Sequence, residues 1–170
     1  HRTIYKVGQD IDRLAQLDLV ASMQPIHATS DYLVADKFWG ARAPYSYNPR
    51  LQLDRGVKVA FGSDTPVEPL GSMRSIHAAV TRQRADGSPG PEGWYPSARL
   101  TVDEALRGHT TGAAYAVGMD DHLGRLAPGY LADLVLLNRD MYTVEPSELL
   151  NVEVVSTMVG GTWRWGEYAR

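Results

Sequence analysis

The sequence predicts a mixed α/β fold joined to a β-structured C-terminal segment, and three observations support this. Short apolar strand-like segments alternate with helical patterns over the first part of the chain, which is typical of a parallel sheet. The two expected strands each run into turn residues and ionisable side chains. About the last fifty residues change character and predict strands joined by glycine turns.

The first expected elements are a short helix and a strand. Apolar residues recur with helix-like spacing within residues 9–17. The segment LVASMQP (residues 19–25) predicts a compact strand that Pro25 ends. The polar and aromatic segment over residues 26–49 is expected to be an irregular loop that contains a short helix.

A second strand is expected over residues 57–61. Residues 50–56 predict the end of a helix, with Gly56 as its C-terminal stop. Apolar side chains at Val57, Val59 and Phe61 alternate along the next segment, as in a short buried strand. This strand runs directly into Gly62-Ser63-Asp64.

Helices are expected to follow the second strand. Residues 72–84 place their apolar side chains on one helical face, which leaves His77 at the surface or at a domain boundary. The Gly- and Pro-rich residues 85–96 predict an exposed loop. Residues 101–104 (TVDE) form a capping box, and the helical pattern after it ends near Gly118.

The C-terminal part is expected to consist of strands. A Pro-Gly turn at residues 128–129 precedes a strongly apolar strand over residues 132–137. Alternation on either side of Gly160-Gly161 predicts a hairpin. We therefore expect two units, at residues 1–118 and 119–170.

Composition excludes several classes of protein. The chain has 170 residues and a net charge of −3, with mixed signs and no basic block, so a nucleic-acid partner is not expected. The absence of cysteine rules out disulfides and thiolate metal sites, and leaves the compartment open. No apolar run approaches the roughly 18–20 residues of a membrane span, so no membrane partner is expected and a cytoplasmic location is favoured.

The beginning of the sequence indicates an internal starting point. It has neither an initiator Met nor the apolar region of a signal peptide. We therefore expect a fragment or a processed form of a longer protein.

Ionisable side chains stand at the ends of both expected strands. Asp64 directly follows the second strand, and His27 lies two residues after Pro25, at the end of the first. In a barrel these strand ends converge on one site. The alternatives are an Asp64 that only forms a turn and a His27 that is only a partly buried loop residue.

Other side chains near these positions also have two interpretations. Asp31 can orient His27, as carboxylates behind a metal-site histidine do, or can cap a helix. The loop aromatics Trp39, Tyr45 and Tyr47 can line a pocket or pack the loop against the body.

The chain lacks the common metal motifs. It contains no HxH, no HExxH and no glycine-rich phosphate loop. A catalytic zinc takes about three protein ligands. Because Asp64, His27 and His1 do not make a closed set, either the chemistry is not metallic or the other ligands lie on residues that are absent.

Three segments together resemble the amidohydrolase superfamily. They are ASMQPIHATSD (residues 21–31), FGSDTPVEP (residues 61–69) and LGRLAPGYLADLVLLNRD (residues 123–140), and they occur in the family's order. TMVGGTW (residues 157–163) fits the final hairpin of the family. The resemblance extends from about Leu14 onward and is closest to the branch that includes N-substituted formamide deformylase.

The resemblance implies a (β/α)8 TIM-type barrel with a small β-sandwich built from both chain ends. This chain would be the C-terminal part of it, namely the last two barrel strands with their helices and the C-terminal strands of the sandwich. The implied reaction is hydrolysis of an amide-type C–N bond in a small-molecule substrate. The implied cofactor is zinc or another divalent metal, with one or two ions in the complete enzyme.

The resemblance also implies roles for individual residues. Asp64 matches the strand-eight Asp, which contacts the metal and carries a proton from the attacking water to the leaving group. His1 falls near the position of the strand-six metal ligand, or is an unrelated terminal residue. The candidate substrate-side residues are His27, Asp31, Trp39 and Tyr45.

The family's HxH motif, its middle metal ligand and its strand-five histidine have no counterpart in this chain. Two strands cannot close a barrel. We therefore expect a complement, either the missing N-terminal part of the enzyme or another copy of this chain in a homo-oligomer. The competing hypothesis is an inactive fragment or association module, and a metal-free lyase or isomerase is disfavoured by the segment GYLADLVLL.

Overall fold

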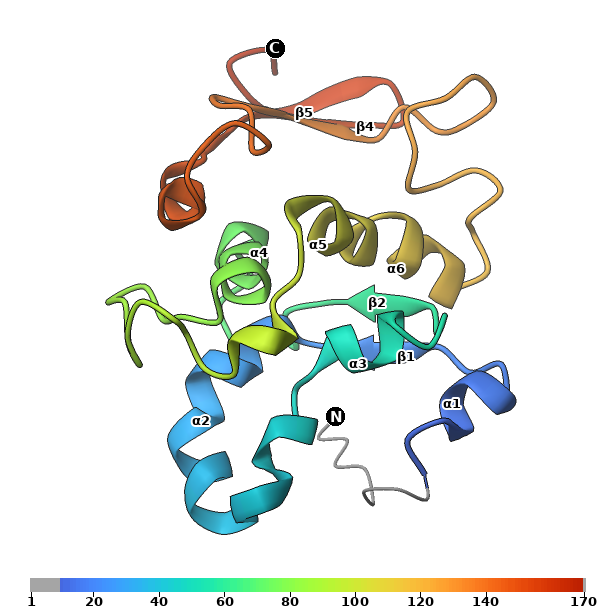
Figure 1. Ribbon diagram of the computed structural model, residues 1–170. Helices are drawn as coiled ribbons and strands as arrows, with labels where there is room; N and C mark the ends of the chain where they lie inside the picture. The colour runs from blue at the N-terminus through green and yellow to red at the C-terminus, as the bar shows by residue number, and fades with distance from the viewer. Residues whose placement is uncertain (1–9, 170) are drawn as a thin grey trace.

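The protein, seen in a computed structural model that describes residues 10–169, has a mixed α/β architecture in which helices α5 and α6 separate two small sheets (Figure 1). In chain order the elements are α1 (Arg13–Gln16), β1 (Ala21–Met23), α2 (Pro25–Trp39), η1 (Gly40–Tyr45), α3 (Pro49–Leu53), β2 (Val59–Phe61), α4 (Ser72–Thr81), η2 (Pro96–Ala98), α5 (Val102–His109), α6 (Thr111–Ala116), β3 (Leu134–Leu137), η3 (Pro146–Asn151), β4 (Val154–Val159) and β5 (Thr162–Gly166).

The strands β1 and β2 form the parallel pair that the sequence predicts. Ala21 lies opposite Val59, and Met23 lies opposite Phe61. Helical segments make the crossover between the two strands, which is the usual connection for parallel neighbours. All three residues of β2 are buried, as expected for a parallel strand covered by helices.

The segment after β1 differs from the sequence prediction. A loop with a short helix was expected over residues 26–49, whereas α2 is a 15-residue helix. Pro25 occupies its first turn, where a missing N–H and a fixed φ are tolerated, so this residue ends the strand and also begins the helix. The polar and apolar side chains of α2 do not separate onto two faces, so hydrophobic periodicity gave no signal.

The main core surrounds β2 and α4. Phe61, Ile76 and Leu149 are buried together, so η3 from the C-terminal part packs onto the same core as the first sheet. The helices α5 and α6 approach β2 closely at two glycines. A Cβ at Gly108 would overlap the Phe61 ring, and one at Gly112 would overlap the carbonyl of Val59.

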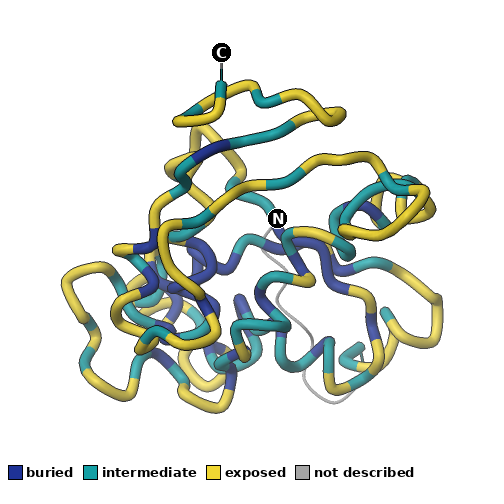
Figure 2. The backbone as a smooth tube through the Cα atoms, turned by 90° about the horizontal axis from the view of Figure 1, so that it is seen from above, coloured by how far each residue is buried: buried dark blue, intermediate teal, exposed yellow. Residues whose placement is uncertain are grey.

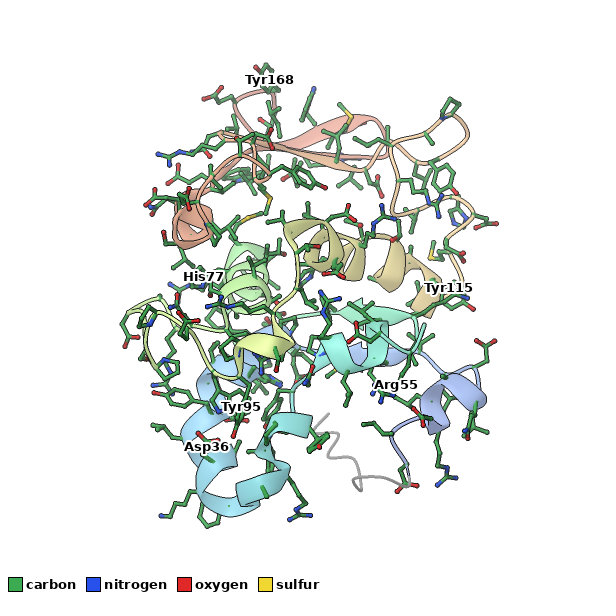
Figure 3. The ribbon with its side chains drawn as sticks, in the orientation of Figure 1. Asp36, Arg55, His77, Tyr95, Tyr115 and Tyr168 are labelled. Atoms are coloured by element: carbon green, nitrogen blue, oxygen red, sulfur yellow. The ribbon has the colours of Figure 1, made fainter. Side chains whose placement is uncertain are left out.

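His77 lies in the buried part of α4, so the predicted surface position is wrong, while the alternative of a boundary between the two expected units stays a prediction (Figure 3). The whole residue is only 4% exposed, and burial lowers the pKa of its imidazole. The helix contacts α2, α5 and η3, so it is covered on several sides. A prediction that assumes one buried face therefore underestimates the burial of α4.

The other predicted helices are present. Residues 101–104 form the capping box at the start of α5, with Thr101 accepting from the Glu104 N–H and Glu104 accepting from the Thr101 N–H. Gly56 has a φ of +73° after α3, as a helix stop requires. Within residues 10–169, no helix combines the length and the apolar character needed to cross a bilayer.

The C-terminal strands form an antiparallel sheet in the order β3-β4-β5, which confirms the predicted strand and hairpin. The hairpin turns at Gly160 and Gly161, which both have positive φ. Figure 2 shows this part of the chain mostly in the colours of intermediate and exposed residues. Val135 and Trp165, for example, are 51% and 58% exposed.

Candidate functional site

The carboxyl ends of β1 and β2 bring His27 and Asp64 together. His27 lies in the first turn of α2, and Asp64 lies three residues after the end of β2. The imidazole Nε2 is 3.9 Å from the carboxylate Oδ2 of Asp64. The side chain of His27 is 10% exposed and that of Asp64 is 43% exposed, so a buried ring faces a carboxylate that solvent can reach.

The Nε2 atom of His27 is buried and has no hydrogen-bond partner among the described residues. Its separation from Asp64 is too long for a hydrogen bond. A buried polar atom without a partner is unfavourable and uncommon in folded proteins. This nitrogen therefore lacks a hydrogen bond that a ligand or a further part of the protein could supply.

A local turn presents the Asp64 carboxylate. Asp64 has a φ of +58°, and its carbonyl accepts a hydrogen bond from the N–H of Val67 at 2.8 Å. The hydroxyls of Ser63 and Thr65 lie 2.8 Å apart, and Thr65 donates to the carbonyl of Glu68 at 3.1 Å. The backbone of Asp64 thus forms a turn while its side chain lies near His27, and a role for this carboxylate in a site stays a prediction.

Tyr47 contacts both candidate residues of α2, His27 and Asp31. Its hydroxyl donates to Asp31 Oδ2 at 2.6 Å, and its ring stands edge-on to the His27 ring at 6.4 Å between centroids. Asp31 lies in the second turn of α2, so it does not cap that helix. The sequence analysis named Tyr47 among the loop aromatics but not among the candidate site residues, and its contact with His27 has no local sequence signal.

Of the other candidate residues, Trp39 lies at the end of α2, Tyr45 lies at the end of η1, and one falls outside the described chain. Trp39 packs against Tyr47, with 5.7 Å between ring centroids, in a buried aromatic cluster. Tyr45 is partly buried at the end of η1. Substrate contact by Trp39 and Tyr45 stays a prediction. His1 falls outside the described residues.

The described residues do not make a complete metal site. Within residues 10–169, no cluster of three or more His, Asp or Glu side chains could hold an ion. His27 and Asp64 offer two donors at most, whereas a catalytic zinc takes about three. A metal at this position would need further ligands from outside the described part of the chain.

A cavity of about 300 Å³ borders the same two segments of chain. Its walls come from the first half of α2, the turn after Asp64, helix α4, the loop that follows α4, and η3. Lining residues include Ile26, Glu68, Arg74, His77 and Leu150. The neighbours of His27 and Asp64 along the chain thus form part of a concave surface.

These features place the chain among mixed α/β proteins whose candidate site lies at the carboxyl ends of parallel strands. Barrel enzymes have their active sites at the same place. A family model described as "Amidohydrolase family" matches residues 1–163. The chain belongs to the amidohydrolase family, which confirms the resemblance seen in the sequence.

Two curated relatives show how much of such a protein is present. The chain is 38% identical over 152 residues to Protein LONG AFTER FAR-RED 3 of Arabidopsis thaliana, covering 88% of this chain and 25% of that protein. It is 34% identical over 116 residues to N-substituted formamide deformylase of Arthrobacter pascens, covering 68% of this chain and 21% of that enzyme. The chain therefore spans about a quarter of the length of the curated relatives that it matches.

A solved structure agrees with the sequence relatives. An uncharacterized metal-dependent hydrolase from Pyrococcus horikoshii matches with a TM-score of 0.71 and 25% identity. The match covers 82% of this chain and 28% of that protein. The predicted α/β class is confirmed by this fold.

Proposed function

We propose that this chain is the C-terminal portion of a metal-dependent amidohydrolase that hydrolyses an amide-type C–N bond in a small molecule. The observation that carries the proposal concerns Nε2 of His27, which is buried, has no hydrogen-bond partner within residues 10–169 and lies 3.9 Å from the Asp64 carboxylate. Family membership and the names of the relatives support the reaction class.

Asp64 and His27 have different roles in this proposal. The half-exposed carboxylate of Asp64 accepts a proton from water and returns it to the leaving nitrogen. The buried imidazole of His27 faces the substrate and donates a hydrogen bond to the oxygen that gains charge in the transition state. Zinc or another divalent metal, when bound, supplies the activated water.

Residues 1–118 would form the last two strands and helices of the barrel, and residues 119–170 the C-terminal strands of a β-sandwich. Two parallel strands leave a barrel open, so the remaining strands and metal ligands must come from elsewhere. The partner is the rest of the enzyme, in the same polypeptide or as a separate piece, or another copy of this chain. The coverage of about a quarter of each relative supports this arrangement.

The second candidate is an inactive fragment that acts through association. It is favoured by the incomplete set of donors in residues 10–169 and by the exposed apolar residues of the C-terminal sheet. In that case Asp64 occupies the position of a catalytic residue, but the chain does not form a complete active site.

The first measurement is the intact mass of the purified material under denaturing conditions, with metal analysis of the same sample. We expect a longer or second polypeptide and about one or two metal ions per complex. This chain alone, without stoichiometric metal, would instead support the inactive fragment.

The second measurement is turnover of an N-formyl amine by the complete protein. Asp64→Asn should lower kcat by about 10² to 10⁴, the range expected for loss of a general acid–base. Asp86→Asn is the matched control, because Asp86 is an exposed carboxylate whose hydrogen bonds within residues 10–169 come from Ser88 of its own turn. Equal activity of the two variants would rule out the role proposed for Asp64.

A further inference from the structure

Arg82 is a buried arginine without a carboxylate partner among the described residues. It follows α4, has a φ of +60° and is 1% exposed. Its Nε donates to the carbonyl of Trp94 at 3.0 Å, and its Nη1 donates to the carbonyl of Tyr47 at 2.7 Å. The guanidinium also lies 5.1 Å from the Trp94 ring, while Nη2 has no hydrogen-bond partner within residues 10–169.

Burying a guanidinium is unfavourable unless hydrogen bonds offset its loss of hydration. Removing an unpaired charge from water destabilises the fold, and burial lowers the pKa of Arg82 to about 9. A planar guanidinium can bond to two carbonyls in fixed directions, which a neutral aliphatic side chain cannot do. The two carbonyls that Arg82 holds belong to Trp94 and Tyr47.

The backbone conformation of Tyr47 explains why its carbonyl needs the hydrogen bond from Arg82. Tyr47 has a φ of +46°, a left-handed conformation that is unfavourable for a non-glycine residue. Its carbonyl is bonded to Arg82, its hydroxyl to Asp31, and its ring contacts Trp39 and Trp94. The surroundings therefore determine this conformation, as is typical of strained residues near functional sites.

The Tyr47 ring in turn limits where the His27 ring can lie. The two rings meet edge-on at an interplanar angle of 85°. No hydrogen bond within the described residues fixes Nε2 of His27, and packing against neighbours such as Tyr47 helps to orient the imidazole. A displaced Tyr47 would leave the His27 ring free to turn away from Asp64.

We propose that Arg82 is a positioning residue of the candidate site, which holds Tyr47 in the conformation that directs His27 toward Asp64. The effect on the His27 ring follows from the geometry alone, whereas an effect on turnover also rests on the proposed function.

The test compares Arg82→Met and Arg82→Lys with the control Arg99→Met. Arg99 is a partly buried arginine whose guanidinium also donates to carbonyls, those of Thr81 and Pro91, and neither hydrogen bond involves Tyr47. NMR signals of the His27 imidazole at fixed pH report the ring environment, and circular dichroism reports folding. We expect a displaced His27 signal in Arg82→Met, a smaller displacement in Arg82→Lys and none in Arg99→Met.

Tyr47→Leu keeps the proposal testable if Arg82→Met does not fold. It removes the ring against His27 while leaving the backbone carbonyl for Arg82, and it should displace the same His27 signal. An unchanged His27 signal in folded Arg82→Met, or in Tyr47→Leu where the arginine variant does not fold, would overturn the proposal.

In the complete enzyme, Arg82→Lys should lower kcat about tenfold with little change in KM, because it misplaces a group that acts in the transition state. An inactive wild-type enzyme would count against the proposed function, while the NMR result would still decide the role of Arg82.

Discussion

The two sheets of this chain differ in how they are covered. All three residues of β2 are buried between helices and its partner strand, whereas β3 and β5 keep large apolar side chains such as Val135 and Trp165 exposed. The candidate site lies at the end of the buried pair. This difference in burial indicates that contacts within this chain stabilise the surroundings of His27 and Asp64. The C-terminal sheet contributes less of its surface to the core.

Among the substitutions considered for the two sheets, Phe61→Ala should lower the free energy of unfolding the most. Phe61 is 7% exposed, and its ring packs against Gly108 and the ring of His109. Removing a buried aromatic side chain should lower the free energy of unfolding by about 3–5 kcal/mol. Urea unfolding measures this change, and a loss below about 1 kcal/mol would show that the first sheet is not the core of the fold.

Lowering the pH should reduce the free energy of unfolding by a smaller amount. His109 packs on Phe61, and burial lowers its pKa to about 4, while a histidine in the unfolded chain titrates near 6.5. The unfolded chain therefore binds more protons between these values, and stability that is complete above about pH 6.5 is lost as the pH falls toward 4. The loss should reach roughly 3 kcal/mol by linkage, and the lowered pKa of His77 acts in the same direction.

Urea unfolding as a function of pH tests this expectation. His109→Gln should flatten the dependence between pH 6.5 and pH 4, because a neutral amide does not titrate. The control is His122→Gln, since His122 lies in a turn beside Asp121 and outside the core. If His109→Gln keeps the full dependence, burial of this histidine is not its source.

The smallest effect is expected in the C-terminal sheet. Val135→Thr replaces a half-exposed apolar residue of β3 with a polar residue of similar shape and strand preference. The free energy of unfolding should change by less than about 0.5 kcal/mol. A loss above about 1 kcal/mol in thermal or urea unfolding would mean that this sheet face is as well packed as β2.

The sequence predicted those elements whose signals are local. The capping box at residues 101–104, the glycine hairpin at residues 160–161 and the alternating strand before Asp64 each depend on neighbouring residues. The length of helix α2 was underestimated because this helix lacks one apolar face and is stabilised by tertiary contacts. The burial of His77 was not predicted, because the elements that cover α4 are distant in the sequence.

The candidate site was predictable only in part for the same physical reason. Asp64 and His27 follow strands, and parallel strands end at one edge, so their proximity could be expected. The contribution of Tyr47 depends on a left-handed backbone and on a bond from Arg82, which is 35 residues away along the chain. Neither feature leaves a pattern in the local sequence.

The pairing of β1 with β2 continues for one residue beyond the strands, since the N–H of Gly62 donates to the carbonyl of Met23 at 3.3 Å. From this bond only two residues lead to Asp64 and four lead to His27. In the extended chain, two residues reach at most about 7 Å, so the sheet works as a short tether for both side chains. The strand pairing raises the effective concentration of the His27 and Asp64 side chains toward each other. A substitution that breaks the hydrogen bonds at this end of the sheet would lower that effective concentration without changing either residue.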